Sequence, residues 1–325
     1  MRYLQNWKIS NSIIVVEPIR VVYMGTAGFA CPSLAALDAS TMIDVIGVVT
    51  QPDRPKGRQL IPHPPAVKVE AENRKLSVHQ PFRLKNDFVF LNELNPELIV
   101  VAAYGQILPQ AILDLPKYGC INVHGSLLPL YRGAAPIQRA ILDGQKETGV
   151  TIMEMEAGLD TGPMISKVAT PIKSNDNAQT LHDRLADLGA KLLVETIPKY
   201  VKGTITASPQ DNSESSHAAK ITRDMGQIDW TKSATDIWNQ SRAFTPWPGI
   251  FTHYKGKLIK LIEVEPINSS GLAPGIIAQS NAEGIIVGCG QKSLRISKLQ
   301  KDGGKRLAAE AFLAGHPLPV GTQLG

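Results

Sequence analysis

The sequence predicts an α/β fold with a Rossmann-like, mostly parallel sheet covered by helices on both faces, followed by a small C-terminal β-barrel of the OB type. Apolar segments that alternate with helical patterns in the first half predict the sheet. A change of composition after residue 203, followed by short β-like segments, predicts the barrel. A chain of 325 residues is long enough for two domains.

Four segments of the first half are rich in valine, isoleucine and other apolar residues, as strands buried on both faces are. They lie at residues 19–24, 44–50, 97–103 and 119–124. Apolar residues at helical spacing lie between and after them, at residues 66–75, 85–94, 134–142 and 178–202. This alternation predicts crossover helices that return each strand to the sheet in parallel.

The second half has a different composition. Residues 204–220 are rich in threonine, serine and asparagine, which is typical of a linker. Short β-like segments follow at residues 251–254, 258–264, 275–278, 285–288 and 294–299. Glycine, proline and asparagine separate them, as in small barrels. We therefore expect an N-terminal extension over residues 1–18, a catalytic domain over 19–203 and a β-barrel domain over 221–325.

The composition excludes several classes of protein. No apolar run reaches the roughly 18 residues of a membrane-spanning helix, and the apolar stretch at residues 13–16 is too short for a signal peptide. The three cysteines lie too far apart for a disulfide framework or a Cys-x-x-Cys metal site. A net charge of +5 permits an anionic partner without requiring one. We expect a cytoplasmic, monomeric protein that uses no metal.

Three polar residues are candidates for catalysis. Asn122 and His124 end the fourth predicted strand, where alternation aims both side chains at one face. The carboxyl ends of parallel strands are where open α/β folds bind ligands. Asp160 lies in a loop between two glycines after the next strand, and it can reach His124 if the two strands end near each other. Taken singly, each of these residues is better explained by a structural role.

Together, the three residue types suit acyl transfer to an amine. The carboxamide of Asn122 can donate a hydrogen bond to the oxyanion that forms when an amine attacks a carbonyl. A protonated His124 can add to that stabilisation and pass a proton to the leaving nitrogen. Asp160 would favour the charged imidazole. The attacking amine is itself the nucleophile, so the chemistry requires no serine or cysteine.

Several segments resemble the motifs of one enzyme family. They are Gln-Pro-Asp-Arg at residues 51–54, Val-Ala-Ala-Tyr-Gly at 101–105, Asn-Val-His-Gly-Ser-Leu-Leu-Pro at 122–129, Gly-Ala-Ala-Pro-Ile-Gln at 133–138 and Gly-Leu-Asp-Thr-Gly at 158–162. On these motifs the chain resembles the folate-dependent formyltransferases, from about residue 19 to its C-terminus. The first and fourth motifs are typical of the branch that acts on methionyl-tRNA.

The resemblance implies a reaction and a set of site residues. The formyl group of the cosubstrate 10-formyltetrahydrofolate would pass to the methionine of an initiator methionyl-tRNA, with Asn122, His124 and Asp160 as the catalytic residues. The resemblance implies a folate site lined by Ser126, Leu127, Leu128 and Pro129. It also implies a loop that reaches the acceptor end of the tRNA through Arg54, Lys56 and Arg58. The C-terminal barrel would hold the acceptor arm of the tRNA through the negative charge of the tRNA phosphate backbone.

Two segments depart from the family's pattern. The turn after the first strand is Gly-Thr-Ala-Gly-Phe at residues 25–29, where the family usually has Gly-Thr-Pro-acidic-Phe. After residue 58 the basic loop continues with Gln-Leu-Ile instead of further glycine and lysine. Basic residues of the C-terminal domain could therefore contribute more of the tRNA contact, and the candidates are Lys255, Lys257, Lys260, Lys298, Lys301, Lys305 and Arg306. We expect the tryptophans at positions 230, 238 and 247 to pack between the domains.

Other functions remain as alternatives. A formyltransferase for an amino sugar nucleotide shares the three polar residues and the Ser-Leu-Leu-Pro segment, but the motifs at residues 51–54 and 133–138 favour tRNA. A non-catalytic RNA-binding relative would not need the three residues intact. The glycines at positions 25 and 28 match poorly both a dinucleotide fingerprint and the phosphate loop of the purine-pathway formyltransferases.

Overall fold

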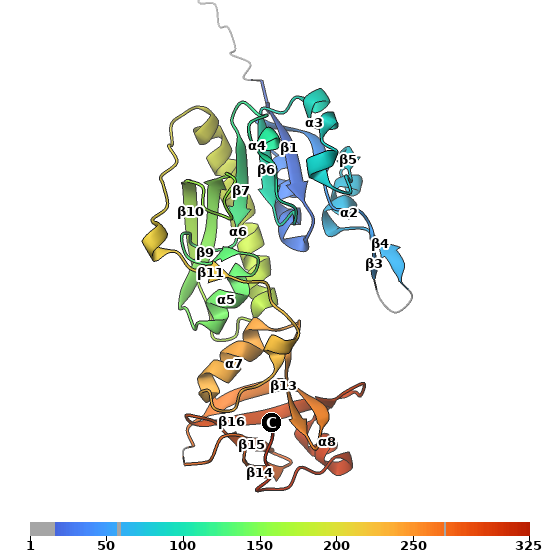
Figure 1. The fold of residues 1–325 in the computed structure, drawn as a ribbon, viewed down its shortest axis with the longest axis vertical. Coiled ribbons are helices and arrows are strands. Elements are labelled where there is room, and N and C mark those ends of the chain that lie inside the picture. Colours follow the sequence, from blue (N-terminus) through green and yellow to red (C-terminus); the bar gives the residue numbers. More distant parts are fainter. Residues whose placement is uncertain (1–16, 57–59, 270) are drawn as a thin grey trace, which may run out of the picture.

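The computed structural model describes residues 17–56, 60–269 and 271–325. Two domains are stacked along the long axis of the molecule, an α/β domain and a C-terminal β domain (Figure 1). Residues 1–16 of the expected N-terminal extension lie outside the described residues. No described helix combines the length and the apolar composition of a membrane span.

A seven-stranded sheet forms the centre of the α/β domain, in the order β10-β9-β7-β6-β1-β2-β5. The four strands that the sequence predicts are confirmed as β1 (Ile19–Gly25), β2 (Ile43–Val49), β6 (Leu98–Ala102) and β7 (Cys120–His124). These four and β5 (Val78–His79) pair in parallel. The strands β9 (Glu147–Glu154) and β10 (Met164–Pro171) extend the sheet in the antiparallel direction.

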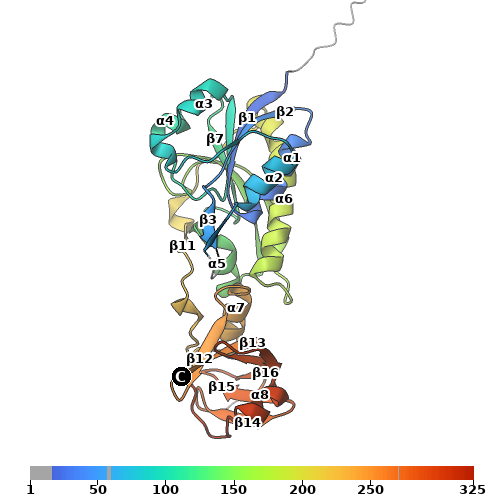
Figure 2. The same cartoon turned by 90° about the vertical axis from the view of Figure 1, so that its right-hand side faces the viewer.

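Helices cover both faces of this sheet, as predicted (Figure 2). One face carries α1 (Cys31–Asp38), α2 (Ala66–Asn73) and α6 (Ala178–Val201), and the other carries α3 (Val89–Leu94) and α4 (Gln110–Leu113). Strand alternation divides the core accordingly. Val21 and Tyr23 belong to the larger cluster under α1 and α6, whereas Val22 and Met24 belong to the cluster under α3 and α4.

The first turn of α6 is held by its own side chains. Asn177 accepts hydrogen bonds from the backbone of Gln179 and Thr180, and Thr180 accepts one from the backbone N–H of Asn177, which completes a capping box. Asp176, directly before the cap, pairs with Arg184, about two helical turns further on, at 2.7 Å. The start of this helix is therefore fixed at the end of the α/β domain that faces the C-terminal domain (Figure 2).

The segment at residues 204–220 lies along the α/β domain. Its strand β11 (His217–Ala218) pairs in parallel with β8 (Arg132–Gly133), and Ser208 pairs with Met164 at the start of β10. The sequence also did not predict the hairpin of β3 (Arg54–Lys56) and β4 (Ile61–His63), which projects from the α/β domain (Figure 1). The hairpin packs no apolar face into a core, because the residues of β4 are all exposed, whereas the segment at residues 204–220 buries only a few side chains, among them Ala218.

The C-terminal domain combines an antiparallel sheet with two helices, which confirms the second part of the predicted fold class. The sheet runs in the order β12-β13-β16-β15-β14, and β17 pairs with β16. Its strands are β12 (Ile250–Tyr254), β13 (Lys257–Ile267), β14 (Ile277–Asn281), β15 (Gly284–Gly288), β16 (Ser293–Lys301) and β17 (Arg306–Ala308). The helices are α7 (Ala234–Ala243) and α8 (Ala309–Gly315).

Helix α7 packs against α5 (Pro136–Leu142) and joins the two domains. The expectation that all three tryptophans lie between the domains is wrong. Trp230 is buried inside the C-terminal domain, where its indole N–H donates to Thr252. Trp247 is 57% exposed, but it lines a pocket with Gln138 and Gln179 of the α/β domain and so lies where the domains meet. Trp238 stacks under the guanidinium of Arg242, 4.0 Å from its ring centre, on the helix that faces the α/β domain.

Candidate active site

Strand β7 places two polar side chains on one face of the sheet. Alternation puts Asn122 and His124 on the same face as Cys120, which packs with the cluster under α3 and α4. Ile121 and Val123 point to the other face, under α6. Asn122 and His124 therefore lie on the same face of β7 as this apolar cluster, toward the carboxyl end of the strand.

Asp160 reaches this face by a route that the sequence does not predict. Because β9 is antiparallel to β7, with Ile121 opposite Glu154, the last residue of β9 lies beside the beginning of β7 and not beside its end. The loop between β9 and β10 folds back over the face instead. It brings one carboxylate oxygen of Asp160 to 3.4 Å from the amide nitrogen of Asn122 and the other to 3.7 Å from Nδ1 of His124.

The imidazole of His124 is oriented by a backbone group. Its Nε2 lies 2.9 Å from the carbonyl oxygen of Tyr131. A carbonyl oxygen can only accept, so Nε2 carries a hydrogen and Nδ1 is the atom that faces the carboxylate of Asp160. The His124 side chain is 6% exposed and that of Asp160 is 15% exposed, so the pair is largely shielded from water. Nδ1 is therefore the ring position that can take up and release a proton in the site.

The side chain of Tyr131 fixes the peptide that holds the histidine. Its hydroxyl donates to Asp143 at 2.9 Å and accepts from Gln145 at 3.0 Å. Burial raises the pKa of Tyr131 to about 12, so the hydroxyl keeps its proton. The ring is thus an anchor for the turn, and its carbonyl is the group that contributes to the site.

Two glycines allow close backbone contacts around Asp160. The N–H of Gly133 donates to Asp160 at 2.8 Å, and Gly133 has a φ of 116°, which side-chain-bearing residues rarely adopt. At Gly162, a Cβ atom would overlap the carbonyl oxygen of Glu154. Asp160 itself has a φ of 53°, in the left-handed region that costs free energy for a residue other than glycine.

Side chains of the segment at residues 204–220 lie behind the site, and the sequence analysis did not identify them. Gln210 donates from its amide nitrogen to the carbonyl oxygens of Asp160 and Gly162, at 2.8 and 2.7 Å. Ser216 accepts from the backbone N–H of Tyr131 at 2.9 Å. The composition of the segment is typical of a linker, and only the fold brings it to the catalytic loops.

Cys120 lies on the same face but does not fit the role of a nucleophile. Burial, followed by the negative charge of Asp114, raises the pKa of its thiol to about 12. Its sulfur lies 3.6 Å from the carbonyl oxygen of Ile112, to which it donates. Among the described residues, no three acidic, histidine or cysteine side chains gather where they could hold a metal ion. The arrangement thus suits transfer to an incoming amine.

The segment predicted to line a folate site forms a compact loop after β7. The hydroxyl of Ser126 donates to the carbonyl of Leu130 at 2.6 Å, and the side chains of Ser126 and Leu128 are buried. Leu127 and Pro129 are half-buried. Lys167 donates to the carbonyl of Leu128 at 2.7 Å. Ser126 and Leu128 therefore shape the loop, and Leu127 and Pro129 have accessible surface.

Two of the three predicted tRNA-binding residues, Arg54 and Lys56, lie on strand β3 of the β3–β4 hairpin. Arg54 is exposed and donates to the side-chain oxygen of Gln51 at 3.3 Å. Lys56 is the last residue of β3, and Arg58 lies outside the described residues. The hairpin projects on the side of the domain from which the C-terminal domain extends (Figure 1). The hairpin follows the carboxyl end of β2, and Asn122 and His124 lie at the carboxyl end of β7 in the parallel part of the same sheet.

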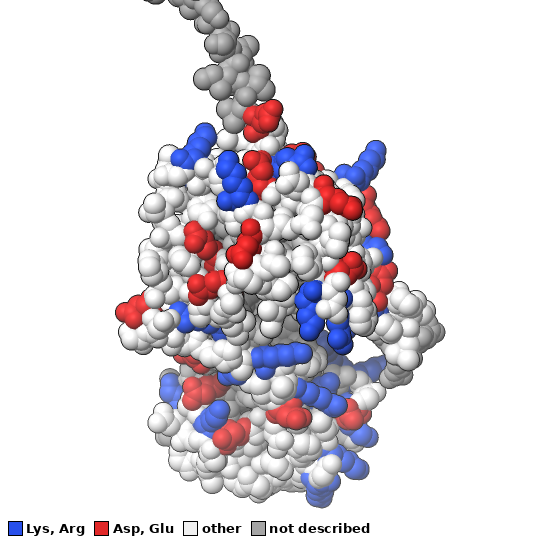
Figure 3. Space-filling view, turned by 45° about the horizontal axis from the view of Figure 1, so that its top comes forward, with Lys and Arg blue, Asp and Glu red and all other residues white. Residues whose placement is uncertain are grey.

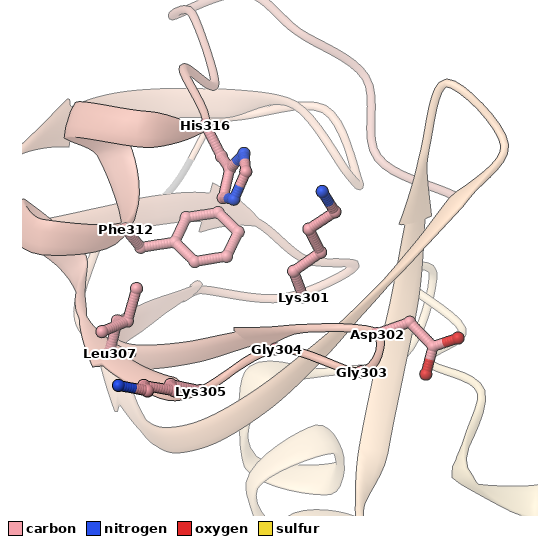
Figure 4. A pocket seen from close by; sticks show the side chains of 8 residues that line it. All are labelled: Lys301, Asp302, Gly303, Gly304, Lys305, Leu307, Phe312 and His316. Carbon is pink, nitrogen blue, oxygen red and sulfur yellow. The ribbon is translucent and has the colours of Figure 1, made fainter.

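Basic side chains are also present on the C-terminal domain. In the view of Figure 3, lysine and arginine side chains gather where the domains meet and over part of the C-terminal domain. One pocket of about 320 Å³ is formed by the turn after β16 and by α8 (Figure 4). Lys301, Phe312 and His316 all line it, and the centres of the Phe312 and His316 rings lie 5.2 Å apart in edge contact. Basic and aromatic side chains around one pocket suit an anionic or nucleic acid partner.

Comparison with known proteins places this geometry in a family. A model of the formyl transferases matches residues 19–197, and a model of the formyl transferase C-terminal domain matches residues 220–317. The chain belongs to the formyltransferase family. A methionyl-tRNA formyltransferase of Citrifermentans bemidjiense is 49% identical over 309 residues, which cover 94% of this chain and 96% of that protein. A methionyl-tRNA formyltransferase of Caldanaerobacter subterraneus is 48% identical and covers 94% of this chain and 100% of its own length.

Solved structures share the fold of this formyltransferase. An N-formyltransferase from Helicobacter canadensis, in complex with folinic acid and dTDP-3-aminofucose, has a TM-score of 0.66 at 22% identity and covers 87% of this chain and 99% of its own. HypX from Aquifex aeolicus has a TM-score of 0.59 at 17% identity, over 92% of this chain and 49% of its own. At these identities the likeness shows the fold alone.

Proposed function

We propose that this chain transfers the formyl group of 10-formyltetrahydrofolate to the α-amino group of methionine on initiator methionyl-tRNA. The observation that carries the proposal is the meeting of Asn122, His124 and Asp160 on one face of the sheet. The relatives that match nearly the whole chain bear the name methionyl-tRNA formyltransferase, which supports this acceptor. The enzyme therefore acts as a one-carbon group transferase with two substrates.

The first step is the attack of the amine on the formyl carbon. A new carbon–nitrogen bond forms, and the formyl oxygen becomes an oxyanion. Asn122 donates a hydrogen bond to this oxygen from its amide nitrogen, which already points into the face where Asp160 lies. The neutral amine supplies the nucleophile, since an α-amino group with an ordinary pKa of about 7.7–8.0 keeps a useful neutral fraction near neutral pH. Asn122 thus acts on the charge that develops in the transition state.

The second step breaks the bond between the formyl carbon and the folate nitrogen. The attacking nitrogen loses a proton and the leaving nitrogen gains one, so the products are formylmethionyl-tRNA and tetrahydrofolate. Nδ1 of His124 is the group placed to carry that proton, because Nε2 is occupied by the carbonyl of Tyr131. Asp160, 3.7 Å from Nδ1, stabilises the ring while it is charged.

The tRNA is held by charge on two surfaces. The β3–β4 hairpin carries Arg54 and Lys56, and the C-terminal domain carries Lys301 beside Phe312 and His316. Lysine and arginine at these places neutralise phosphates without reading sequence. The folate binds along the loop of residues 126–129. The enzyme works as a cytoplasmic monomer, with the catalytic domain over residues 19–203, a connecting segment over 204–220 and the tRNA-binding domain over 221–325.

A formylation assay tests this function. The purified chain is incubated with 10-formyltetrahydrofolate, labelled in the formyl group, and one of two acceptors: methionyl initiator tRNA or a dTDP-linked amino sugar. We expect labelled formylmethionine after hydrolysis of the tRNA and no labelled sugar. Label on the sugar alone, or no transfer to either acceptor above the rate without protein, would overturn the proposal. Sedimentation of the same preparation checks that the enzyme is a monomer.

A further inference from the structure

We propose that Gln210, in the segment that joins the two domains, is a positioning residue that holds Asp160 in its catalytic orientation. This inference rests on the proposed function, because it gives Gln210 a role only if Asp160 takes part in formyl transfer. Gln210 does not lie on the catalytic face and contacts no catalytic side chain. It acts through the backbone of the β9–β10 loop.

The contacts of Gln210 hold the backbone of Asp160 and of the residue two positions after it. One amide nitrogen donates to the carbonyl of Asp160 at 2.8 Å and to the carbonyl of Gly162 at 2.7 Å. An NH₂ group has two hydrogens, so both bonds form at once. They join the peptide that follows Asp160 to the peptide that follows Gly162 and close this turn of the loop around one donor. The rotation of the Asp160 backbone is thereby restricted on its C-terminal side.

The loop needs an external tie because it has little packing of its own. Leu159 is 59% exposed, so the residue next to Asp160 contributes little burial. Asp160 has a φ of 53°, a conformation that persists in a residue other than glycine only when neighbouring groups impose it. The hydrogen bonds from Gln210 are such groups. Without them, we expect the loop to populate conformations that move the carboxylate away from His124.

The orientation of Gln210 is itself fixed by Arg132. The Nε of Arg132 donates to the side-chain oxygen of Gln210 at 2.9 Å, and a second nitrogen donates to Asn212 at 2.9 Å. Since the oxygen accepts from an arginine, the NH₂ group must face the loop. Ser208, two residues before Gln210, pairs with Met164 through two backbone hydrogen bonds of 2.8 and 2.9 Å. Both ends of the contact are therefore built into the fold.

The same segment also supports the histidine side of the site. The backbone N–H of Arg132 donates to the carbonyl of Ser216 at 2.9 Å, and the hydroxyl of Ser216 accepts from Tyr131 at 2.9 Å. Tyr131 provides the carbonyl that orients His124. The segment thus contacts both the turn of Tyr131, which orients His124, and the loop that carries Asp160, and Gln210 is its contact with the Asp160 loop.

Two substitutions separate the donor from the rest of the side chain. Gln210→Glu keeps an oxygen for Arg132 but replaces the NH₂ donor, and Gln210→Met keeps the length without any hydrogen bond. We expect both to lower kcat about 10-fold to 100-fold, as displacement of a catalytic group by about 1 Å does. KM for methionyl-tRNA and for 10-formyltetrahydrofolate should change less than about threefold. Ser215→Ala, in the same segment, is the matched control and should retain the wild-type kcat.

A double-mutant cycle with Asp160→Asn distinguishes positioning from a general structural effect. Single-turnover rates are measured with enzyme in excess, so that slow variants remain measurable. If Gln210 acts through Asp160, Gln210→Glu should cost less than about twofold in the Asp160→Asn background. Thermal unfolding of each variant confirms that it is folded at the assay temperature. Should Gln210→Met unfold there, Gln210→Glu carries the test, because it retains its hydrogen bond to Arg132.

The outcomes separate the inference from the function on which it rests. No formyl transfer by the wild-type chain would refute the proposed function. Transfer that survives Asp160→Asn undiminished would refute the catalytic assignment of Asp160. With both of these intact, the role of Gln210 is overturned by a wild-type kcat in Gln210→Glu and Gln210→Met, by a rise of KM alone, or by an undiminished loss in the Asp160→Asn background.

Discussion

At the scale of single residues, hydrogen bonds to neighbouring backbone groups fix the direction of the polar side chains in the candidate site. His124 is held by the carbonyl of Tyr131, and Asp160 is held by the N–H of Gly133. A catalytic group that is already oriented needs no reorganisation when charge develops in the transition state. The three candidate residues can therefore act together although they come from two separate parts of the chain.

The first prediction concerns the two polar residues of β7. Asn122→Ala should lower kcat about 10²- to 10³-fold, because it removes a donor to the oxyanion. His124→Ala should lower it about 10²- to 10⁴-fold, because it removes the proton carrier. Initial rates of formylmethionyl-tRNA formation measure both effects, with circular dichroism to confirm the fold. Wild-type rates in either variant would show that the assignment of that residue is wrong.

At the scale of elements, the beginning of α6 contains a charged pair that links folding to pH. Asp176 is buried and accepts from Arg184 at 3.0 and 2.7 Å. Burial alone would raise the pKa of Asp176, but the hydrogen bonds from Arg184 and from the backbone of Lys173 outweigh it and hold the pKa below its ordinary value. Folding thus favours the charged form of the Asp176 carboxyl group over the protonated form.

The second prediction follows from the sign of this shift. A carboxyl group whose pKa is lowered in the folded state adds stability above its ordinary pKa of about 3.9, and this stability is lost as the pH falls through the folded value. We expect Asp176→Asn to lower the free energy of unfolding by about 2 kcal/mol at pH 7, as the loss of charged hydrogen bonds does. Urea unfolding at several pH values measures the difference from wild type, which should shrink below about pH 4.

A matched control lies on the same helix. Asp183 pairs with His182 at 2.8 Å, but its side chain is 63% exposed. Asp183→Asn should therefore change the free energy of unfolding by less than about 0.5 kcal/mol, since exposed pairs contribute little. An equal loss in both variants, or a difference for Asp176→Asn that does not begin to shrink as the pH falls below about 4, would contradict the account of the buried pair.

The third prediction concerns the β3–β4 hairpin as a tRNA contact. Replacing both Arg54 and Lys56 by alanine should raise KM for methionyl-tRNA and leave KM for the folate unchanged. If both residues neutralise phosphates, the slope of log KM against log salt should fall by about 0.7–0.9 for each lost contact. Steady-state rates at several salt concentrations provide the measurement. Lys199→Ala, near the distant C-terminal end of α6, is the control, and an unchanged salt slope in the hairpin variant would exclude the contact.

At the scale of the whole molecule, the domains are joined by a small set of specific contacts. Arg242 of α7 donates to the carbonyls of Lys173 and Asp176, each at 3.2 Å, on the loop that precedes α6. Its guanidinium also donates to Asn239 at 2.6 Å and lies over the ring of Trp238. Asp176, whose side chain stabilises the start of α6, thus also binds the C-terminal domain through its backbone carbonyl.

The fourth prediction is that Arg242→Ala loosens this arrangement. A tRNA that touches both domains must then order them when it binds, so KM for methionyl-tRNA should rise roughly tenfold, as the loss of charged hydrogen bonds worth about 1.5 kcal/mol implies. KM for 10-formyltetrahydrofolate should stay within about twofold, because the catalytic domain keeps its own contacts. Arg74→Ala, which removes ion pairs to Asp38 and Glu70 inside one domain, is the control. Equal changes of both KM values in Arg242→Ala would argue against the interpretation.

Much of the fold and part of the site follow from local patterns. The period of two places Asn122 and His124 on one face of β7 whatever the strand packs against. Apolar strands and helical spacing were enough to identify β1, β2, β6, β7 and α6. The β3–β4 hairpin was not identified, since it is formed by charged and proline residues that pack no apolar face.

The sequence by itself determined the family, the two classes of domain and the identity of the candidate catalytic residues, because these depend on residue types and short spacings. Only the tertiary structure decided how the residues meet. Alternation does not encode strand direction, and the antiparallel course of β9 is what sends Asp160 back across the sheet. Gln210 belongs to a segment with linker composition, and its contact with Asp160 exists because the chain folds back along the catalytic domain before entering the next one.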